Sequence, residues 1–243
     1  MTFTYTLTCT LDTTAALPPV AGSEEQRAYW VTPTILAWPL SLLPRGMDRE
    51  VVVTDAGDPL PGSGLALRLI TAPDGGAAAI HGRILGADGM PAPTITPLRI
   101  VGNLPGEVLA AHPHLEGYIA LSATNAAGIP LLDDAAVASA LTGQVAIAQY
   151  VEAPDPTEDA DISDAHLDAF TGVQTAILLD HLYAEDATRA ELGVTFSGGL
   201  PSFALWAPTA QAVTLLTWET GDPLGSVPEL SLIHISEPTR QAE

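Results

Sequence analysis

Hydrophobic and polar residues alternate in short runs along most of the chain, which is the period of half-buried strands. Residues 3–10 alternate aromatic or aliphatic side chains with threonine, and residues 28–40 hold two aromatic runs separated by Thr32 and Pro33. Glycine and proline, with 21 of each, separate the runs and favour turns over long helices. The same pattern predicts further strands at 65–71, 77–85, 119–123, 145–151, 194–196, 203–206 and 213–218.

Helices are expected to be few and short. Residues 134–141 are rich in alanine and are followed by Gly143, which can close a helix. A single turn is predicted at 107–111 and a short amphipathic connector at 177–183. The acidic, proline-containing stretch at 154–164 is typical of a solvated loop.

These elements predict a mostly β chain with four parts. Residues 1–24 stay unassigned, and residues 25–186 are expected to form a β-sandwich accessory domain with a few short helices. Residues 187–229 are expected to form a truncated Ig-like β-sandwich, because an Ig-like domain needs about 100 residues and seven strands. Fewer than half of those strands are predicted before residue 229.

Residues 230–243 are interpreted as an artefactual tail. Residues 230–240 read Leu-Ser-Leu-Ile-His-Ile-Ser-Glu-Pro-Thr-Arg, which looks like the in-frame translation of a transposase adapter used in sequencing libraries. We therefore exclude the tail from fold reasoning.

Charge and composition narrow the classes of partner. The chain has 29 acidic residues against eight basic ones, all arginine, and a formal net charge of -21. This charge repels phosphate backbones, so nucleic acid is excluded as a partner, whereas a neutral glucan feels no such repulsion. No run reaches the roughly eighteen apolar residues of a membrane span, and the first ten residues do not resemble a signal peptide. The lone Cys9 gives no disulfide framework, and the localisation stays open.

No catalytic constellation is found in the sequence. Asp133 and Asp134 are adjacent carboxylates, and neighbours on a strand point to opposite faces. His112 and His114 lack a third metal ligand. There is no Gly-x-Ser-x-Gly elbow or phosphate-binding loop. No cofactor is expected, and calcium at the acidic loop, which offers oxygen ligands without the EF-hand spacing, stays open as an alternative.

Aromatic residues are the remaining candidates for binding. An exposed Trp or Tyr can stack on the apolar face of a sugar ring, whereas a buried one fills the core. Trp30 and Trp38 are our candidate carbohydrate-binding residues, with core packing as the equal alternative. For Trp206 we favour core packing.

Several segments in order resemble the N-terminal region of type I pullulanases. Residues 26–31, Gln-Arg-Ala-Tyr-Trp-Val, and 34–38, Thr-Ile-Leu-Ala-Trp, look like the opening strand pair of the domain that precedes the starch-binding module in that family. Residues 112–118 match the family pattern Phe-Pro-His-Leu-x-Gly-Tyr, with His112 in place of Phe. Residues 192–194 and 203–213 resemble the start of a carbohydrate-binding module family 48 domain, an Ig-like sandwich.

The resemblance implies a non-catalytic fragment of a debranching glycoside hydrolase of family 13. Its parent would hydrolyse α-1,6-glucosidic bonds, and the fragment would bind α-glucan (starch, pullulan or glycogen) and support a catalytic barrel that lies in the same polypeptide beyond residue 229. An adhesion or surface-binding module of stacked β-sandwiches is the alternative, since the strand pattern fits it equally well.

Overall fold

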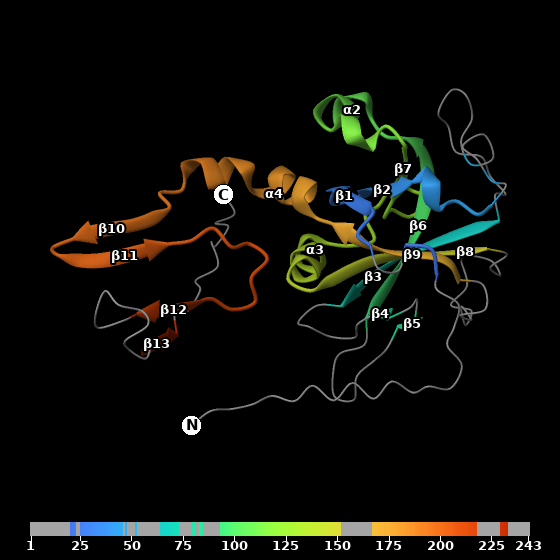
Figure 1. Ribbon diagram of the computed structural model, residues 1–243. Helices are drawn as coiled ribbons and strands as arrows, with labels where there is room; N and C mark the ends of the chain where they lie inside the picture. Colours follow the sequence, from blue (N-terminus) through green and yellow to red (C-terminus); the bar gives the residue numbers. More distant parts are fainter. Residues whose placement is uncertain are drawn as a thin grey trace.

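The structure is a computed structural model that describes residues 20–22, 25–45, 47, 52, 64–72, 79–80, 83–84, 93–151, 167–217 and 229–232. Two parts are seen, a seven-stranded barrel and a smaller group of strands beyond it. Helix α4 (Ala176–Arg189) runs from the first part to the second (Figure 1).

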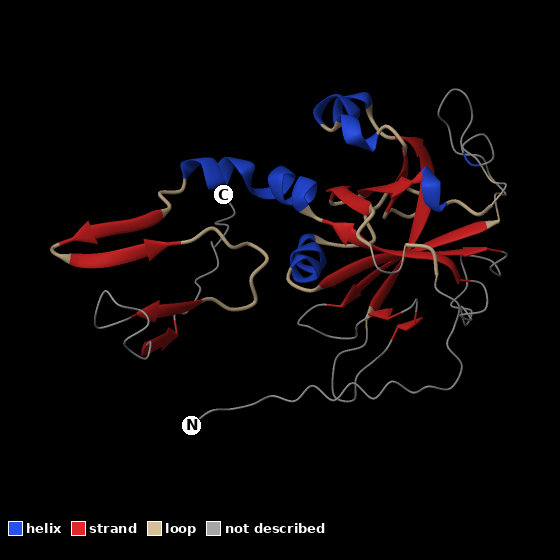
Figure 2. Cartoon of the chain, viewed as in Figure 1, coloured by secondary structure: helices blue, strands red, loops and turns tan. Residues whose placement is uncertain are grey.

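The barrel strands follow one another in a closed circuit in the order β1-β2-β7-β6-β3-β8-β9. Figure 2 shows the strands in red and the helices in blue. Neighbours are antiparallel except for β1 and β9, which pair in parallel. The strands are β1 (Ala28–Thr32), β2 (Ile35–Pro39), β3 (Leu65–Ala72), β6 (Thr94–Asn103), β7 (Tyr118–Ser122), β8 (Gln144–Val151) and β9 (Leu167–Gln174).

The mostly β fold with a few helices is confirmed, but the expected sandwich is closed at both edges. Strand β6 pairs with β3 through residues 94–98 and with β7 through residues 99–103, so it belongs to both sheets. Strand β9 pairs with β8 along its length and adds two residue pairs with β1. Because both edges are paired, these strands leave no open edge for another chain to extend.

The predicted strands around residues 28–40, 65–71, 119–123 and 145–151 are confirmed. Strand β6 was not predicted from the sequence, because Pro97 and Gly102 interrupt its alternation. Gly102 has φ 117° and lies where the register with β7 shifts, a backbone position that favours glycine. Strand β9 was also missed. The predicted strand at 3–10 lies outside the described residues.

The barrel interior contains a buried hydrogen-bonded amide among aromatic and aliphatic side chains. Gln149 on β8 is completely buried. Its Oε1 accepts a hydrogen bond from Trp38 Nε1 on β2 at 3.0 Å. Its Nε2 donates to the carbonyl of Leu42 at 2.7 Å and to Asp168 Oδ2 on β9 at 2.8 Å. One side chain therefore ties three other segments together inside the barrel.

The helices lie outside the strands. Helix α3 (Asp134–Leu141) begins where predicted, because Asp133 Oδ1 accepts a hydrogen bond from the Ala136 amide at 2.8 Å as an N-cap. Helix α4 has 14 residues and is longer than the predicted connector. The remaining short elements of the first part are η1 (Leu40–Leu42), β4 (Ala79–Ile80), β5 (Arg83–Ile84), α2 (Gly106–Ala111) and η3 (Pro113–Leu115).

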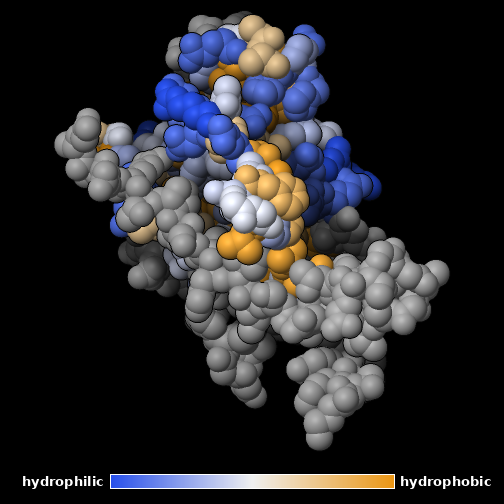
Figure 3. Space-filling model, turned by 90° about the vertical axis from the view of Figure 1, so that its left-hand side faces the viewer, coloured by the Kyte–Doolittle hydropathy of each residue, from blue (hydrophilic) through white to orange (hydrophobic). Residues whose placement is uncertain are grey.

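Strands β10 (Gly193–Ser197) and β11 (Leu200–Ala204) form an exposed hairpin beyond α4. Its register pairs Val194 with Phe203 and Phe196 with Pro201, so these four apolar residues share one face. Phe196 is 73% exposed. Figure 3, which views the molecule from the hairpin end, shows hydrophobic residues gathered in the middle of that face of the molecule. The hairpin therefore presents an uncovered apolar face.

A second strand pair lies next to the hairpin. Strand β12 (Thr214–Thr217) confirms the strand predicted at 213–218 and pairs with β13 (Glu229–Leu232). Residues 230–232 belong to the tail that we excluded from the fold, and the structure nevertheless pairs them with β12. The alternation in Leu-Ser-Leu suits a strand, and the edge of β12 accepts such a segment. The Ig-like assignment of residues 187–229 stays a prediction.

Within the described residues, the longest apolar helical stretch falls short of what crossing a membrane requires.

The two buried tryptophans form a matched pair for a stability test. Both indoles are fully buried, but Trp38 Nε1 has Gln149 as its partner, whereas Trp30 Nε1 has no partner among the described residues. We expect Trp38→Phe to lower the free energy of unfolding more than Trp30→Phe, by about 1–2 kcal/mol, because it leaves the Gln149 oxygen unpaired. Urea unfolding measures both. Equal losses, or a larger loss for Trp30→Phe, would contradict a stabilising hydrogen bond between Trp38 and Gln149.

The apolar hairpin face predicts self-association of the chain. Light scattering after size-exclusion chromatography should show a mass that rises with protein concentration. The double variant Phe196→Ser and Phe203→Ser should remove this rise without changing the melting temperature of the barrel. The control is Thr195→Ala with Ser202→Ala, on the opposite face, which should behave like the parent. A concentration-independent mass for the parent chain would refute the prediction.

Candidate functional site

Trp30 and Trp38 do not form a binding surface, which corrects the sequence prediction. Both side chains are 0% exposed and belong to the main core cluster inside the barrel. Stacking on a sugar needs an accessible ring face, and neither indole has one. Their role in this structure is core packing, which was the alternative reading.

Unlike the two tryptophans, Tyr29 and Tyr118 lie on the outside of the barrel. Side chains alternate along a strand, so the inward Trp30 places Tyr29 on the outer face of β1. Tyr29 pairs with Ala37, and Ala37 pairs with Ala120 on the neighbouring strand. These small alanines leave room on the outer face for aromatic rings. Tyr118, at the start of β7, is packed against the same outer cluster.

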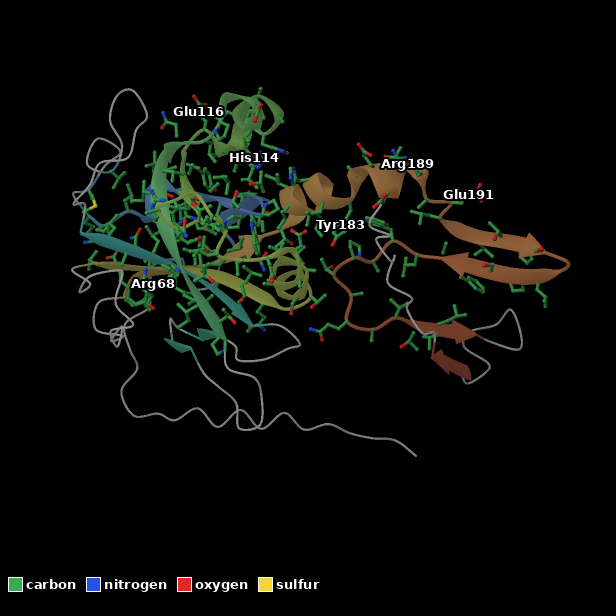
Figure 4. All side chains as sticks on the ribbon, turned by 180° about the vertical axis from the view of Figure 1, so that it is seen from behind. Arg68, His114, Glu116, Tyr183, Arg189 and Glu191 are labelled. Atoms are coloured by element: carbon green, nitrogen blue, oxygen red, sulfur yellow. The ribbon has the colours of Figure 1, made fainter. Side chains whose placement is uncertain are left out.

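The short helices bring histidines to this outer face. Pro113 begins η3, and His114 follows it in an exposed position. The Tyr29 ring centroid lies 5.2 Å from that of His114 and 5.6 Å from that of Tyr118. His112 lies 5.9 Å from His114. We call Tyr29, His112, His114 and Tyr118 the aromatic cluster. Figure 4 shows His114 beside helix α2 at one end of the barrel.

Electrostatics around the aromatic cluster are mild. Burial raises the pKa of Tyr118 because it penalises the phenolate, and the neighbouring Tyr29 raises this pKa further. Arg27 opposes both effects and lowers it, while Arg27 Nε also pairs with Glu25 Oε2 at 3.1 Å. The Tyr118 phenol therefore stays neutral at physiological pH and can both donate and accept hydrogen bonds.

The chemistry available at the aromatic cluster is binding. The ring of Tyr29 is tilted by 58° against that of His114 and by 76° against that of Tyr118, so the rings meet at an angle and do not form a flat platform. His112 and His114 were weighed as metal ligands, and no group of three candidate ligands occurs among the described residues. Trp30 and Trp38 were selected from the sequence and Tyr29 and Tyr118 were not, although the alternation around Trp30 was a signal that Tyr29 faces the opposite side.

The acidic candidates do not converge with the aromatic cluster. Asp133 is engaged as the N-cap of α3, and Asp134 begins that helix. The acidic loop at 154–164 lies outside the described residues, so calcium binding there stays a prediction.

Tyr118 should titrate above the ordinary tyrosine value of about 10. Because burial and Tyr29 both raise the pKa of Tyr118, we expect Tyr29→Phe to lower it and Arg27→Ala to raise it further. NMR of ¹³C-labelled tyrosine, followed against pH, measures this pKa directly. Tyr183→Phe, on helix α4, is the control and should leave it unchanged. A Tyr118 pKa at or below the ordinary value would show that the ring is not buried as described.

Comparisons with known proteins extend the resemblance seen in the sequence. A family model described as the Pullulanase N2 domain matches residues 25–181. A pullulanase from Klebsiella pneumoniae is 32% identical over 112 residues, which cover 46% of this chain and 8% of that protein.

Solved structures give the same result. PulA from Klebsiella oxytoca superposes with a TM-score of 0.53 at 26% identity, covering 86% of this chain and 15% of that one. A maltotriose complex of PulA from Klebsiella pneumoniae superposes with a TM-score of 0.51 at 26% identity, covering 81% of this chain and 16% of that one. The chain thus spans a small part of the length of these relatives. Because the family model matches all seven barrel strands and the start of α4, this chain belongs to the pullulanase N2 domain family.

Proposed function

We propose that this chain is a non-catalytic accessory region of a starch-debranching glycoside hydrolase, and that it contacts α-glucan through the aromatic cluster. The family match over residues 25–181 carries the first half of the proposal. Several of the similar structures are complexes with maltotriose, which supports an α-glucan as the ligand class.

The geometry of the aromatic cluster supports the second half. Tyr29 and Tyr118 are partly exposed, and His114 is exposed, on the outer face of a rigid barrel. A sugar ring can pack its C–H face on these rings while its hydroxyls exchange hydrogen bonds with phenol and imidazole groups. A neutral glucan also approaches a chain with a net charge of -21 without repulsion.

Glucan binding can be tested by electrophoresis in native gels that contain soluble starch, pullulan or glycogen. We expect retardation of the chain, and a roughly tenfold weaker affinity for Tyr29→Ala with Tyr118→Ala, equivalent to about 1.4 kcal/mol of lost contact. Tyr183→Ala is the matched control, because it removes an aromatic ring outside the cluster. Melting temperatures show whether each variant is folded. Unchanged mobility of the parent chain in all three gels would overturn the binding role.

The non-catalytic role predicts that the purified chain releases no reducing sugar from pullulan. Hydrolysis by positioned carboxylates needs a preorganised pair across the bond, and Asp133, one of the two adjacent acids considered from the sequence, is used as the N-cap of α3. A reducing-end assay at high protein concentration measures this. Release that persists through repurification would show that the chain carries its own active site.

A further inference from the structure

A cleft of about 820 Å³ lies on the outer face of strands β3, β8 and β9, where none of the aromatic-cluster residues lines it. This volume falls within the range of roughly 300–1,000 Å³ that is usual for pockets that bind small ligands. The cleft is bordered by the chain at Glu25 and Gln26, by the turn between α3 and β8, and by Thr209 from the second part of the molecule.

Small residues form part of the floor of the cleft, beside larger ones such as Ile70 and Phe170. The register places Ile70, Ala146 and Gly172 side by side across three strands, with Ala72 beside Gln144 one step further along. At Gly172 an added Cβ would lie 2.8 Å from Cγ of Gln26, so only glycine allows this close approach. The Gly172 amide also donates to the carbonyl of Glu25 at 2.9 Å, which holds the border in place.

Neutral polar groups line the walls. Three carboxamides and three hydroxyls contribute to them, from Gln26, Gln144, Gln174, Thr142, Thr175 and Thr209. The amide of Gln174 is engaged, with its Nε2 donating to the carbonyl of Gln26 at 2.7 Å. The side-chain amides of Gln26 and Gln144 bond to no other described residue and are exposed. These two groups are the donors and acceptors available to a ligand.

Charge is nearly absent from this cleft, although the chain as a whole is strongly acidic. Among the described lining residues Glu25 is the one charged side chain, and it pairs with Arg27. An anionic ligand would therefore find no positive charge among these lining residues, and a cationic ligand would find a carboxylate that is already paired. Carboxamides and hydroxyls can each donate and accept, which matches the hydroxyl groups of an uncharged carbohydrate.

From this chemistry we propose that the cleft is a second ligand site, which takes an uncharged, polyhydroxylated ligand of the size of a short oligosaccharide. The choice of an α-glucan as that ligand rests on the proposed function. Strand pairing sets Gln174 beside Tyr29, so the cleft begins next to the aromatic cluster and a linear glucan can reach both.

The same site links the two parts of the molecule. Thr209 lies beyond the hairpin and still lines the cleft, and Gln211 Nε2 donates to the carbonyl of Thr142 at 2.6 Å. Tyr183 on α4 meets Trp206 edge to face at 5.9 Å, and Figure 4 shows Tyr183 near the middle of α4, with Arg189 closer to the hairpin. A ligand in the cleft therefore contacts both parts and favours the arrangement in which they meet.

NMR titration of the full chain with maltotriose tests this inference residue by residue. Saturable shifts are expected for the side-chain amides of Gln26 and Gln144 and for the backbone amides of Gly143 and Gly172. The variant Gln26→Ala with Gln144→Ala should weaken binding at Gly143 and Gly172 roughly tenfold while leaving shifts at the aromatic cluster in place. The control is Thr188→Ala, an exposed hydroxyl on α4 away from the cleft, which should bind as the parent does.

The outcomes separate the two proposals. Shifts confined to the aromatic cluster would overturn the cleft site and leave the proposed function standing. Shifts confined to the cleft would support this inference and remove the aromatic cluster from the proposed function. Absence of shifts at both places at millimolar maltotriose would overturn both. If the Gln26→Ala, Gln144→Ala variant binds maltotriose in the cleft with the affinity of the parent chain, this inference would also be overturned, because these two side chains would then not contact the ligand.

Discussion

The barrel depends on one buried amide. Gln149 accepts from the Trp38 indole and donates to the Leu42 carbonyl and to Asp168, so β8 is joined to β2, to η1 and to β9 through the interior. A buried polar group costs stability when its partners are lost, by about 1–3 kcal/mol for each group left unpaired. Segments more than a hundred residues apart in the chain are therefore fixed in one register, and the hydrophobic side chains pack around that arrangement.

Fixing the register also decides which residues face outward. Side chains alternate on a strand, so a β1 that turns Trp30 into the core must present Tyr29 to the outside. The outer face of β1 and β7 gains the aromatic cluster, and the outer face of β3, β8 and β9 gains the small residues of the cleft floor. Both proposed binding surfaces therefore follow from the closure of the same barrel. Tyr29, Tyr118 and the floor of the cleft lie on strands, where a site is held more precisely than on a loop, whereas the histidines and the borders of the cleft come from short helices, turns and loops.

The sequence alone predicted the class of fold and most of the barrel strands, because their alternation is regular. It could not tell which member of the pair Tyr29 and Trp30 faces the core, since periodicity separates two faces without saying which one is covered. Strand β6 was not predicted because Pro97 and Gly102 interrupt its pattern. Pro97 is accommodated opposite Arg68 of β3, and Gly102 lies at the register shift with β7. In an alternating strand a polar residue such as Gln149 is expected on the surface, so the sequence does not show that it is buried. The cleft combines residues from five separate segments of the chain, and no local sequence pattern predicts such a combination.

In our proposal, α-glucan contacts the outer surface of the barrel and not its tryptophans. A crystal structure of the chain soaked with maltotriose tests it most directly. We expect a glucose ring packed against Tyr29 and Tyr118, with Trp30 and Trp38 still enclosed in the core. Sugar bound to either tryptophan after an opening of the barrel, or bound only at a surface remote from Tyr29 and the cleft, would contradict it.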